Sequence, residues 1–262
     1  MPFTFSHPAI VLPATKLPKK YYSMSSLITG SMTPDFEYFI RMRDYSRYSH
    51  TIAGMFWFDL PLGLALLFIF HNIVRDTLIR YMPFIFNVRF SFAEKFNWNN
   101  YFRKNVFIVL ISLLVGIGSH LLWDSFTHHD DYFAETIPFL NGESLVLGHS
   151  VYVASILQFA SSIAGGIIII IFIVTLPEGK YTGRPNILNF WLMVTFIMIM
   201  VINARLYIHP ILNHHFYGDA IVTIISAALI GILIMSALLH NRQIPSYKHL
   251  RRVRNRQAAS FK

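Results

Sequence analysis

Residues 105–131 read NVFIVLISLLVGIGSHLLWDSFTHHDD, and this stretch decides the kind of fold to expect. Its part 105–123 is almost wholly apolar and has the length of one bilayer-crossing helix, about 20 residues. Three polar residues, His120, Asp124 and His128, recur at every fourth position as the apolar run ends. On an α-helix this spacing turns by only about 40° per step, so the three side chains share one face. The stretch predicts a membrane helix ending in a face suited to a divalent metal.

The composition extends this expectation to the whole chain of 262 residues. Hydrophobic residues make up 54% and charged residues 13%, which is unusual for a soluble domain. Four further segments, 51–70, 152–176, 187–208 and 220–239, are apolar enough, or nearly so, to cross a bilayer. We therefore expect an all-α polytopic membrane bundle with about five full spans. It forms one integral membrane domain: an N-terminal hairpin at 1–50, the spans at 51–239 and a basic cytoplasmic tail at 240–262.

The charges between the spans predict the orientation. The connection 71–104 and the tail 240–262 hold many of the Lys and Arg residues, whereas 124–151 holds none and carries Asp130, Asp131, Glu135 and Glu143. The positive-inside rule places the basic segments in the cytoplasm and the acidic connection outside. No aromatic or groove-reading pattern accompanies the basic tail, so we expect it to touch anionic lipid and not nucleic acid.

The first fifty residues hold two short apolar stretches, 9–14 and 22–32, separated by Lys16, Lys19 and Lys20. Neither stretch is long enough to cross a bilayer alone. We expect a helical hairpin, or a broken and partly inserted pair, with its basic turn toward the cytoplasm. Irregular backbone at membrane depth has to be buried against other helices or line a wet cavity.

On this topology, several His and Asp residues lie near the outer membrane face. The candidate metal ligands are His7, Asp35, His50, His120, Asp124, His128 and His149. Without cysteine, a thiolate site is excluded, and imidazole with carboxylate suits Zn²⁺ best, or Mn²⁺ or Fe, over Ca²⁺. Each ligand also has a plain alternative, such as a hydrogen-bonded pair of His120 with Asp124 that only packs helices.

One or two ions at such a site could activate a water for ester or phosphoester hydrolysis. An unligated carboxylate, Glu37 or Asp130, could then serve as the base. The location favours a lipid or a lipid-linked substrate. Asp59, inside the first apolar segment, is expected to orient a ligand histidine, or to bond across a kink at Pro61.

Four motifs carry a family resemblance: MPFTFSHPAIVLP at 1–13, GSMTPDFEYF at 30–39, FDLPLG at 58–63 and SHLLWDSFTH at 119–128. Together they resemble an uncharacterised family of bacterial membrane proteins, the domain of unknown function 4184. The order of His7, Asp35, His50 and SHLLWDSFTH is similar, more distantly, to membrane-bound metal-dependent hydrolases and to zinc-dependent phospholipase C. The resemblance implies a helical metal-binding protein of the bacterial inner membrane.

Two other kinds of function fit the same residues. A transporter or channel would bind or pass a cation or proton, and a scaffold would hold a structural metal or none. Ligands gathered at one end with an open coordination position favour the enzyme, and a polar trail across the midplane favours transport. The sequence leaves the oligomeric state open.

Overall fold

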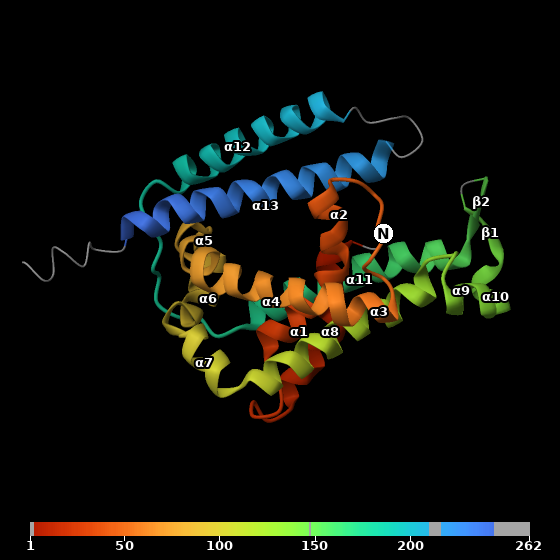
Figure 1. The fold of residues 1–262 in the computed structure, drawn as a ribbon, viewed down its shortest axis with the longest axis horizontal. Helices are drawn as coiled ribbons and strands as arrows, with labels where there is room; N and C mark the ends of the chain where they lie inside the picture. Colours follow the sequence, from red (N-terminus) through yellow and green to blue (C-terminus); the bar gives the residue numbers. More distant parts are fainter. Residues whose placement is uncertain (1–2, 147, 210–215, 244–262) are drawn as a thin grey trace, which may run out of the picture.

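The computed structural model describes residues 3–146, 148–209 and 216–243 (Figure 1). Within these residues, five helical segments are long and apolar enough to cross a membrane: Ile52–Tyr81, Val106–Thr136, Val153–Thr175, Ile187–Ile208 and Phe216–His240. This confirms the predicted helical fold with five spans. Most of the predicted basic tail, 244–262, lies outside the described residues, and the predicted domain boundaries stay predictions.

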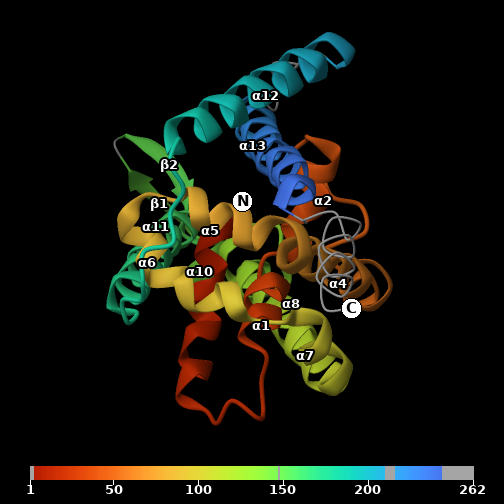
Figure 2. The same ribbon diagram turned by 90° about the vertical axis from the view of Figure 1, so that its left-hand side faces the viewer.

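The N-terminal region forms two short helices joined by a loop, as Figure 2 shows. The first, η1 (Thr4–Lys16), is a 3₁₀ helix containing Pro8 and Pro13, which cannot donate the hydrogen bonds of an α-helix. The second, α1 (Met24–Gly30), leads through the 3₁₀ turn η2 (Thr33–Asp35) into α2 (Phe36–Arg41). Helix η1 packs against α1 and α11, and α1 packs against α8, so this irregular backbone is covered by helices.

The first span is a continuous helix that contains two π-helical turns. Its parts are α3 (Ile52–Gly54), the π-helical turn η3 (Met55–Asp59), α4 (Leu60–Ile69), a second π turn η4 (Phe70–Val74) and α5 (Arg75–Tyr81). Pro61 lies in the first turn of α4 and offers no backbone N–H, which explains the irregular turn just before it. Turns of this kind are frequent at functional sites.

Short helices connect the first span to the second. They are α6 (Phe84–Phe90), the 3₁₀ turn η5 (Ser91–Lys95) and α7 (Trp98–Lys104). The second span, α8 (Val106–Thr127), runs through the core, where Val109, Leu113 and Ile117 are fully buried. Helices α1 and α8 approach closely because Gly30 and Gly116 face each other: a Cβ on Gly116 would lie 2.9 Å from the Cα of Gly30.

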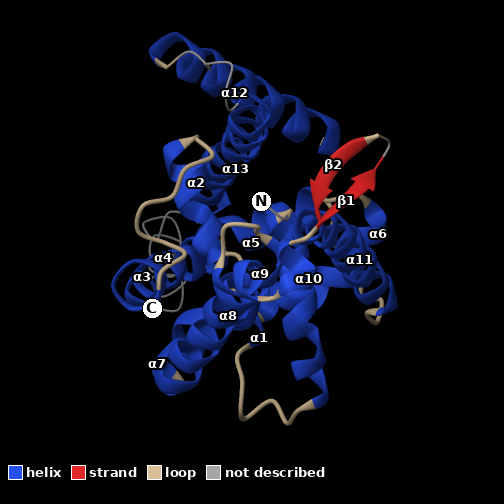
Figure 3. Cartoon of the chain, turned by 90° about the vertical axis from the view of Figure 1, so that its right-hand side faces the viewer, coloured by secondary structure: helices blue, strands red, loops and turns tan. Residues whose placement is uncertain are grey.

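After α8 the chain forms a small cap at one end of the molecule. It contains α9 (Tyr132–Thr136), α10 (Pro138–Asn141) and an antiparallel pair of strands, β1 (Glu143–Val146) and β2 (His149–Tyr152). Figure 3, which looks at that end of the molecule, shows the strand pair beside α11. In Figure 1, helices α5 to α7 lie at the opposite end.

The last three spans are α11 (Val153–Thr175), α12 (Ile187–Ile208) and α13 (Phe216–Gln243). Helices α12 and α13 lie side by side as one layer (Figure 1), and α13 packs on α2, η4 and α5. Arg205 on α12 donates to the carbonyl of Met42 at 3.2 Å, and Asp219 on α13 accepts from the backbone N–H of Asp44 at 2.8 Å. These two spans therefore hold the loop that leads toward His50.

Candidate metal centre

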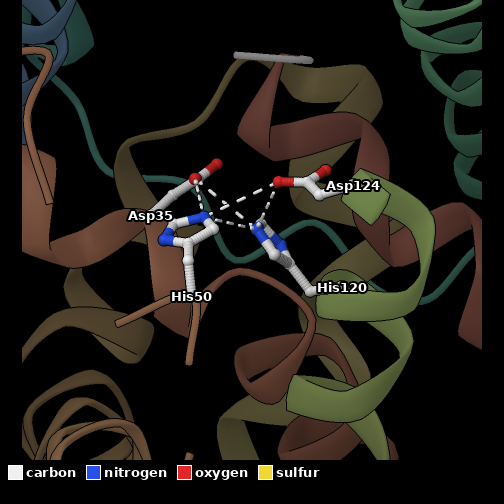
Figure 4. Close-up of side chains that lie close together, drawn as sticks. All are labelled: Asp35, His50, His120 and Asp124. Carbon is white, nitrogen blue, oxygen red and sulfur yellow. Dashed lines mark hydrogen bonds and ion pairs between the residues drawn. The ribbon is translucent and has the colours of Figure 1, made fainter. Parts of the chain in front are cut away.

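Four side chains from three segments of the chain face one another inside the bundle (Figure 4). Asp35 ends η2, His50 lies in the loop before α3, and His120 and Asp124 lie one turn apart on α8. Each offers one nitrogen or oxygen atom, and these four atoms all lie within 4.8 Å of one another. The side chains of His120, Asp35 and Asp124 are at most 3% exposed, whereas that of His50 is 20% exposed. The group can therefore be reached from the side of His50.

The distances in this group suit a shared ion better than direct pairing. The Nε2 atom of His120 lies 3.3 Å from Asp124 Oδ2 and 3.5 Å from Asp35 Oδ1. The Nε2 atom of His50 lies 3.5 Å from Asp35 Oδ1, 3.6 Å from Asp124 Oδ2 and 3.4 Å from His120 Nε2. Charge-assisted hydrogen bonds are shorter, about 2.7–2.9 Å. Donor atoms around a tetrahedral zinc, at about 2.0–2.1 Å from the ion, lie about 3.3–3.4 Å apart.

Both histidines are turned so that Nε2 faces the centre. His120 Nδ1 lies 2.8 Å from the carbonyl oxygen of Ser31, which can only accept, so Nδ1 carries the proton of the neutral ring. His50 Nδ1 lies 2.9 Å from the hydroxyl of Ser49. Metal-binding histidines commonly bond their second nitrogen in this way, because it fixes the ring and leaves a lone pair for the ion.

Unpartnered buried oxygens give the clearest sign that something is bound here. Asp35 Oδ1 and both carboxylate oxygens of Asp124 are buried and accept no hydrogen bond among the described residues. The other oxygen of Asp35 accepts from the hydroxyl of Thr4 at 2.6 Å. A buried carboxylate without a partner is costly, and buried charges are normally paired or coordinate a metal. The four residues therefore fit a divalent ion held by two imidazoles and two carboxylates.

His50 takes an unusual backbone conformation, with φ 58° in the left-handed region. For a residue other than glycine such strain costs about 1–3 kcal/mol and persists only where the surroundings enforce it. Here Glu37 enforces it, because its carboxylate accepts the backbone N–H groups of Arg47, Tyr48 and Ser49 at 2.8–3.0 Å. Arg41 donates to the same carboxylate at 2.7 Å.

These bonds change the expected role of Glu37. Burial alone would raise its pKa, but the three backbone N–H groups and Arg41 together lower the pKa of Glu37 to about 2. A carboxylate that accepts so many hydrogen bonds is a poor proton acceptor. The structure thus favours Glu37 as the residue that positions His50, in place of the predicted general base.

The charges of the group act on one another. Burial would lower the pKa of His50, but the neighbouring carboxylates of Asp124 and Asp35 raise it to about 9. Burial would raise the pKa of Asp35, but the neighbouring imidazoles of His120 and His50 hold it below its usual value. Burial, followed by the charge of His120, lowers the pKa of His7 to about 4. His7 is therefore a neutral imidazole near pH 7.

Two predicted ligands border the group of four. The ring of His7 stacks on that of His120 at 3.9 Å between centroids, and its Nε2 lies 3.5 Å from Asp124 Oδ1. Neither ring nitrogen of His7 has a hydrogen-bond partner in the described part of the chain. His128 Nδ1 lies 3.7 Å from Asp124 Oδ2, and its Nε2 lies 3.1 Å from Gln158. Asp124 thus lies between the group of four and the two bordering residues, His7 and His128.

Three other residues singled out from the sequence are His149, Asp130 and Asp59, and none of them belongs to the group of four. His149 is exposed on β2, outside the group of four. Asp130 is exposed and forms an ion pair with His129 at 2.9 Å. Asp59 is fully buried, and neither of its oxygens accepts a hydrogen bond within the described residues. The expectation that Asp59 orients a ligand histidine, or bonds across the kink, is therefore not met by any hydrogen bond.

The family comparison covers the same features. The model of a domain of unknown function (DUF4184) matches residues 1–237, which include all four clustered residues and most of the last span. The chain belongs to the DUF4184 family. No curated protein matches it, and no solved structure does. Membership of DUF4184 confirms the predicted family, while the more distant resemblance to metal-dependent hydrolases stays a prediction.

In this DUF4184 chain, sequence reasoning missed the groups that orient the ligands. Thr4 and the carbonyl of Ser31 bond Asp35 and His120 across 31 and 89 positions of the chain. A threonine in an apolar segment carries no metal-binding signal, and a backbone carbonyl carries none at all. The available hint for Thr4 was its place in the N-terminal motif TFSHP, three residues before His7.

Proposed function

We propose that this protein is a membrane-embedded, metal-dependent hydrolase that acts on an ester or phosphoester. The observation that carries the proposal is the set of buried oxygens on Asp35 and Asp124 that accept no hydrogen bond among the described residues and that face the Nε2 atoms of two histidines. The ligands gather on the last turns of α8, at one end of a span. This placement supports a site at a membrane face. From the charge pattern we propose that it is the outer face, and from the family resemblance that the membrane is a bacterial inner membrane.

Zinc is the metal we favour, with manganese or iron as the other choices. Two imidazole nitrogens and two carboxylate oxygens form a donor set that all three ions accept. When bound, such an ion polarises the substrate oxygen and acidifies a water in its coordination sphere. Asp35, Asp124 and His120 hold the buried side, and His50 leaves an approach to the solvent side.

The residues around the four candidate ligands hold the ligand side chains in their orientation. Thr4, Ser49 and the carbonyl of Ser31 each bond one ligand, and Glu37 holds the loop of His50. Hydrogen bonds to another atom of a ligand side chain orient that ligand, and their loss commonly lowers metal affinity about 10- to 100-fold. Asp130 stays the predicted base; it lies on the exposed connection after α8 and would have to leave His129 to reach a substrate.

Metal content tests the proposal first. We would measure bound metals by elemental mass spectrometry in the purified wild type, in Asp35→Ala and in His120→Ala, with His129→Ala as the matched control. Hydrolysis of bis-p-nitrophenyl phosphate and p-nitrophenyl butyrate would be assayed in parallel. We expect one ion per chain and hydrolysis in the wild type and the control, and neither in the other two. A folded wild type without metal would overturn the proposal.

A structural metal is the second candidate, because four protein ligands is the number found in structural zinc sites. X-ray absorption spectroscopy separates the two functions. A catalytic ion shows a further light-atom ligand from water that an added phosphate displaces. A closed shell of four protein ligands, insensitive to phosphate and without hydrolysis, would identify a structural site.

A further inference from the structure

A second feature, an apolar cavity of about 180 Å³, lies beside the metal centre between η1, α8 and α11. Six of its lining residues are apolar or lack a polar side chain: Ala9, Ile10, Trp123, Ala164, Gly165 and Ile168. Helices η1 and α11 meet closely at its floor, where a Cβ on Gly165 would lie 2.9 Å from the Cβ of Ser6. Helices η1 and α11 therefore touch at Gly165 and Ser6, and the cavity lies beside this contact.

The three serine hydroxyls of the lining are already engaged. The hydroxyl of Ser6 donates to the carbonyl of Ser162, and the hydroxyls of Ser161 and Ser162 donate to the carbonyl of Gln158. A polar ligand would therefore find few free donors along the wall. His7 also borders the cavity; it is 4% exposed and has no hydrogen-bond partner among the described residues. The chemistry of the wall suits a hydrocarbon chain.

The cavity lies between the lipid-facing side of the bundle and the metal centre, and the ring of His7 separates it from the four clustered residues. Its outer rim includes Ile10 and Ile168, which are 40% and 48% exposed, and the exposed Ala164. Only 6% of the apolar stretch of α11 is buried inside the protein, so in a membrane most of the surface of this helix faces hydrocarbon. The inner wall is His7, whose Nε2 lies 3.5 Å from Asp124 Oδ1. A hydrocarbon chain lying in the cavity would therefore end at His7, next to Asp124 of the metal centre.

We infer that this cavity binds one hydrocarbon chain of a membrane lipid that enters sideways from the bilayer. The chain lies between η1 and α11, and the ester or phosphoester group of the same lipid passes His7 to reach the four clustered residues. The second half of this inference rests on the proposed hydrolase function. Binding of the chain stands on the cavity alone.

Photo-crosslinking tests the chain site directly. The full-length protein would be placed in nanodiscs with phosphatidylglycerol carrying a diazirine in the middle of one acyl chain, and labelled peptides mapped by mass spectrometry. We expect strong labelling of the peptides that hold Ala9 and Ile168. Substituting Ala164→Phe at the exposed rim fills the cavity and should reduce that labelling several-fold. Ile167→Phe, at an exposed neighbour that does not line the cavity, should leave it unchanged.

The design separates this inference from the hydrolase proposal. His120→Ala should lose the metal but keep the labelling, and Ala164→Phe should keep the metal. Ile168→Trp serves as a second filling variant in case Ala164→Phe folds poorly. Equal labelling of all lipid-facing helices, unchanged by both filling variants, would overturn the chain site even if metal and hydrolysis are found. Labelling confined to the cavity without any hydrolysis would uphold the chain site and sink only the hydrolase.

Discussion

Three of the four clustered side chains, Asp35, His50 and His120, turn one atom toward the centre while a hydrogen bond holds another atom of the same side chain. For Asp35 that hold is the 2.6 Å hydrogen bond from Thr4, on a helix remote in sequence. The bond fixes which oxygen of Asp35 faces the two histidines. Orientation at the residue scale should therefore appear in the metal affinity.

Thr4→Val tests this orientation, because valine keeps the shape of threonine and removes only the hydroxyl. We expect the affinity for zinc to fall about 10- to 100-fold, as for other bonds that orient a ligand. Competition with a chelating dye measures it. Thr15→Val is the control, since the hydroxyl of Thr15 bonds only the carbonyl of Leu12 within the same helix. Equal affinities in both variants would mean that the hydroxyl does not orient Asp35.

Glu37 holds the strained loop of His50 through three backbone N–H groups. In Glu37→Gln, the new amide group points a donor at these donors, so we expect a loss of about 2–3 kcal/mol of unfolding free energy. The thermal unfolding midpoint should fall, and the amides of 47–49 should exchange hydrogen faster. The exposed Glu135→Gln is the control. Unchanged exchange at 47–49 would remove the positioning role of Glu37.

At the scale of elements, the contact of α1 with α8 brings Asp35 to His120. Gly116 permits this contact, because a Cβ there would lie 2.8 Å from Ser31 N and 2.9 Å from Gly30 Cα. Ser31 also supplies the carbonyl that bonds His120. Moving α1 away from α8 should therefore disturb stability and the metal centre together.

Gly116→Ala is the variant that moves these helices apart. Although alanine favours a helix more than glycine does, overpacking should cost about 1–3 kcal/mol and weaken metal binding. Gly118→Ala, two residues along the same helix, should be tolerated because its Cβ meets only Met55 Cε at 3.8 Å. Thermal unfolding and metal content measure both effects. A stable, metal-replete Gly116→Ala variant would contradict the close-packing argument.

At the scale of the molecule, the cap of α9, α10, β1 and β2 lies at one end and α5 to α7 at the other (Figure 1). This separation agrees with the alternation of acidic and basic connections in the sequence. The outward orientation of the acidic end is a prediction from charge alone.

The absence of native cysteine makes that orientation easy to measure. We would introduce Ser144→Cys in β1 and Asn100→Cys in α7, both at exposed positions, and treat intact expressing cells with a membrane-impermeant maleimide. Ser144→Cys should react in intact cells, and Asn100→Cys only after permeabilisation. The reverse pattern would place the metal centre on the cytoplasmic side.

The helical membrane fold and the pairing of His120 with Asp124 on one helix face can be predicted from local patterns of residues alone. Apolar runs of bilayer length predict spans without reference to neighbours, because the backbone of a span satisfies its own hydrogen bonds. The spacing of His120 and Asp124 places them on one helix face, which is a local property of the chain. Asp35 and His50 were named as ligands from their predicted membrane side and from the family resemblance.

Tertiary structure decided which candidates meet and what orients them. The sequence could not show that Asp35 and His50 meet His120 and Asp124, because their proximity depends on the packing of α1 on α8 and on the loop held by Glu37. It could not show that Glu37 is occupied by backbone N–H groups, or that Thr4 bonds Asp35. Such contacts join positions far apart in the chain, and no local pattern of residues encodes a distance between them.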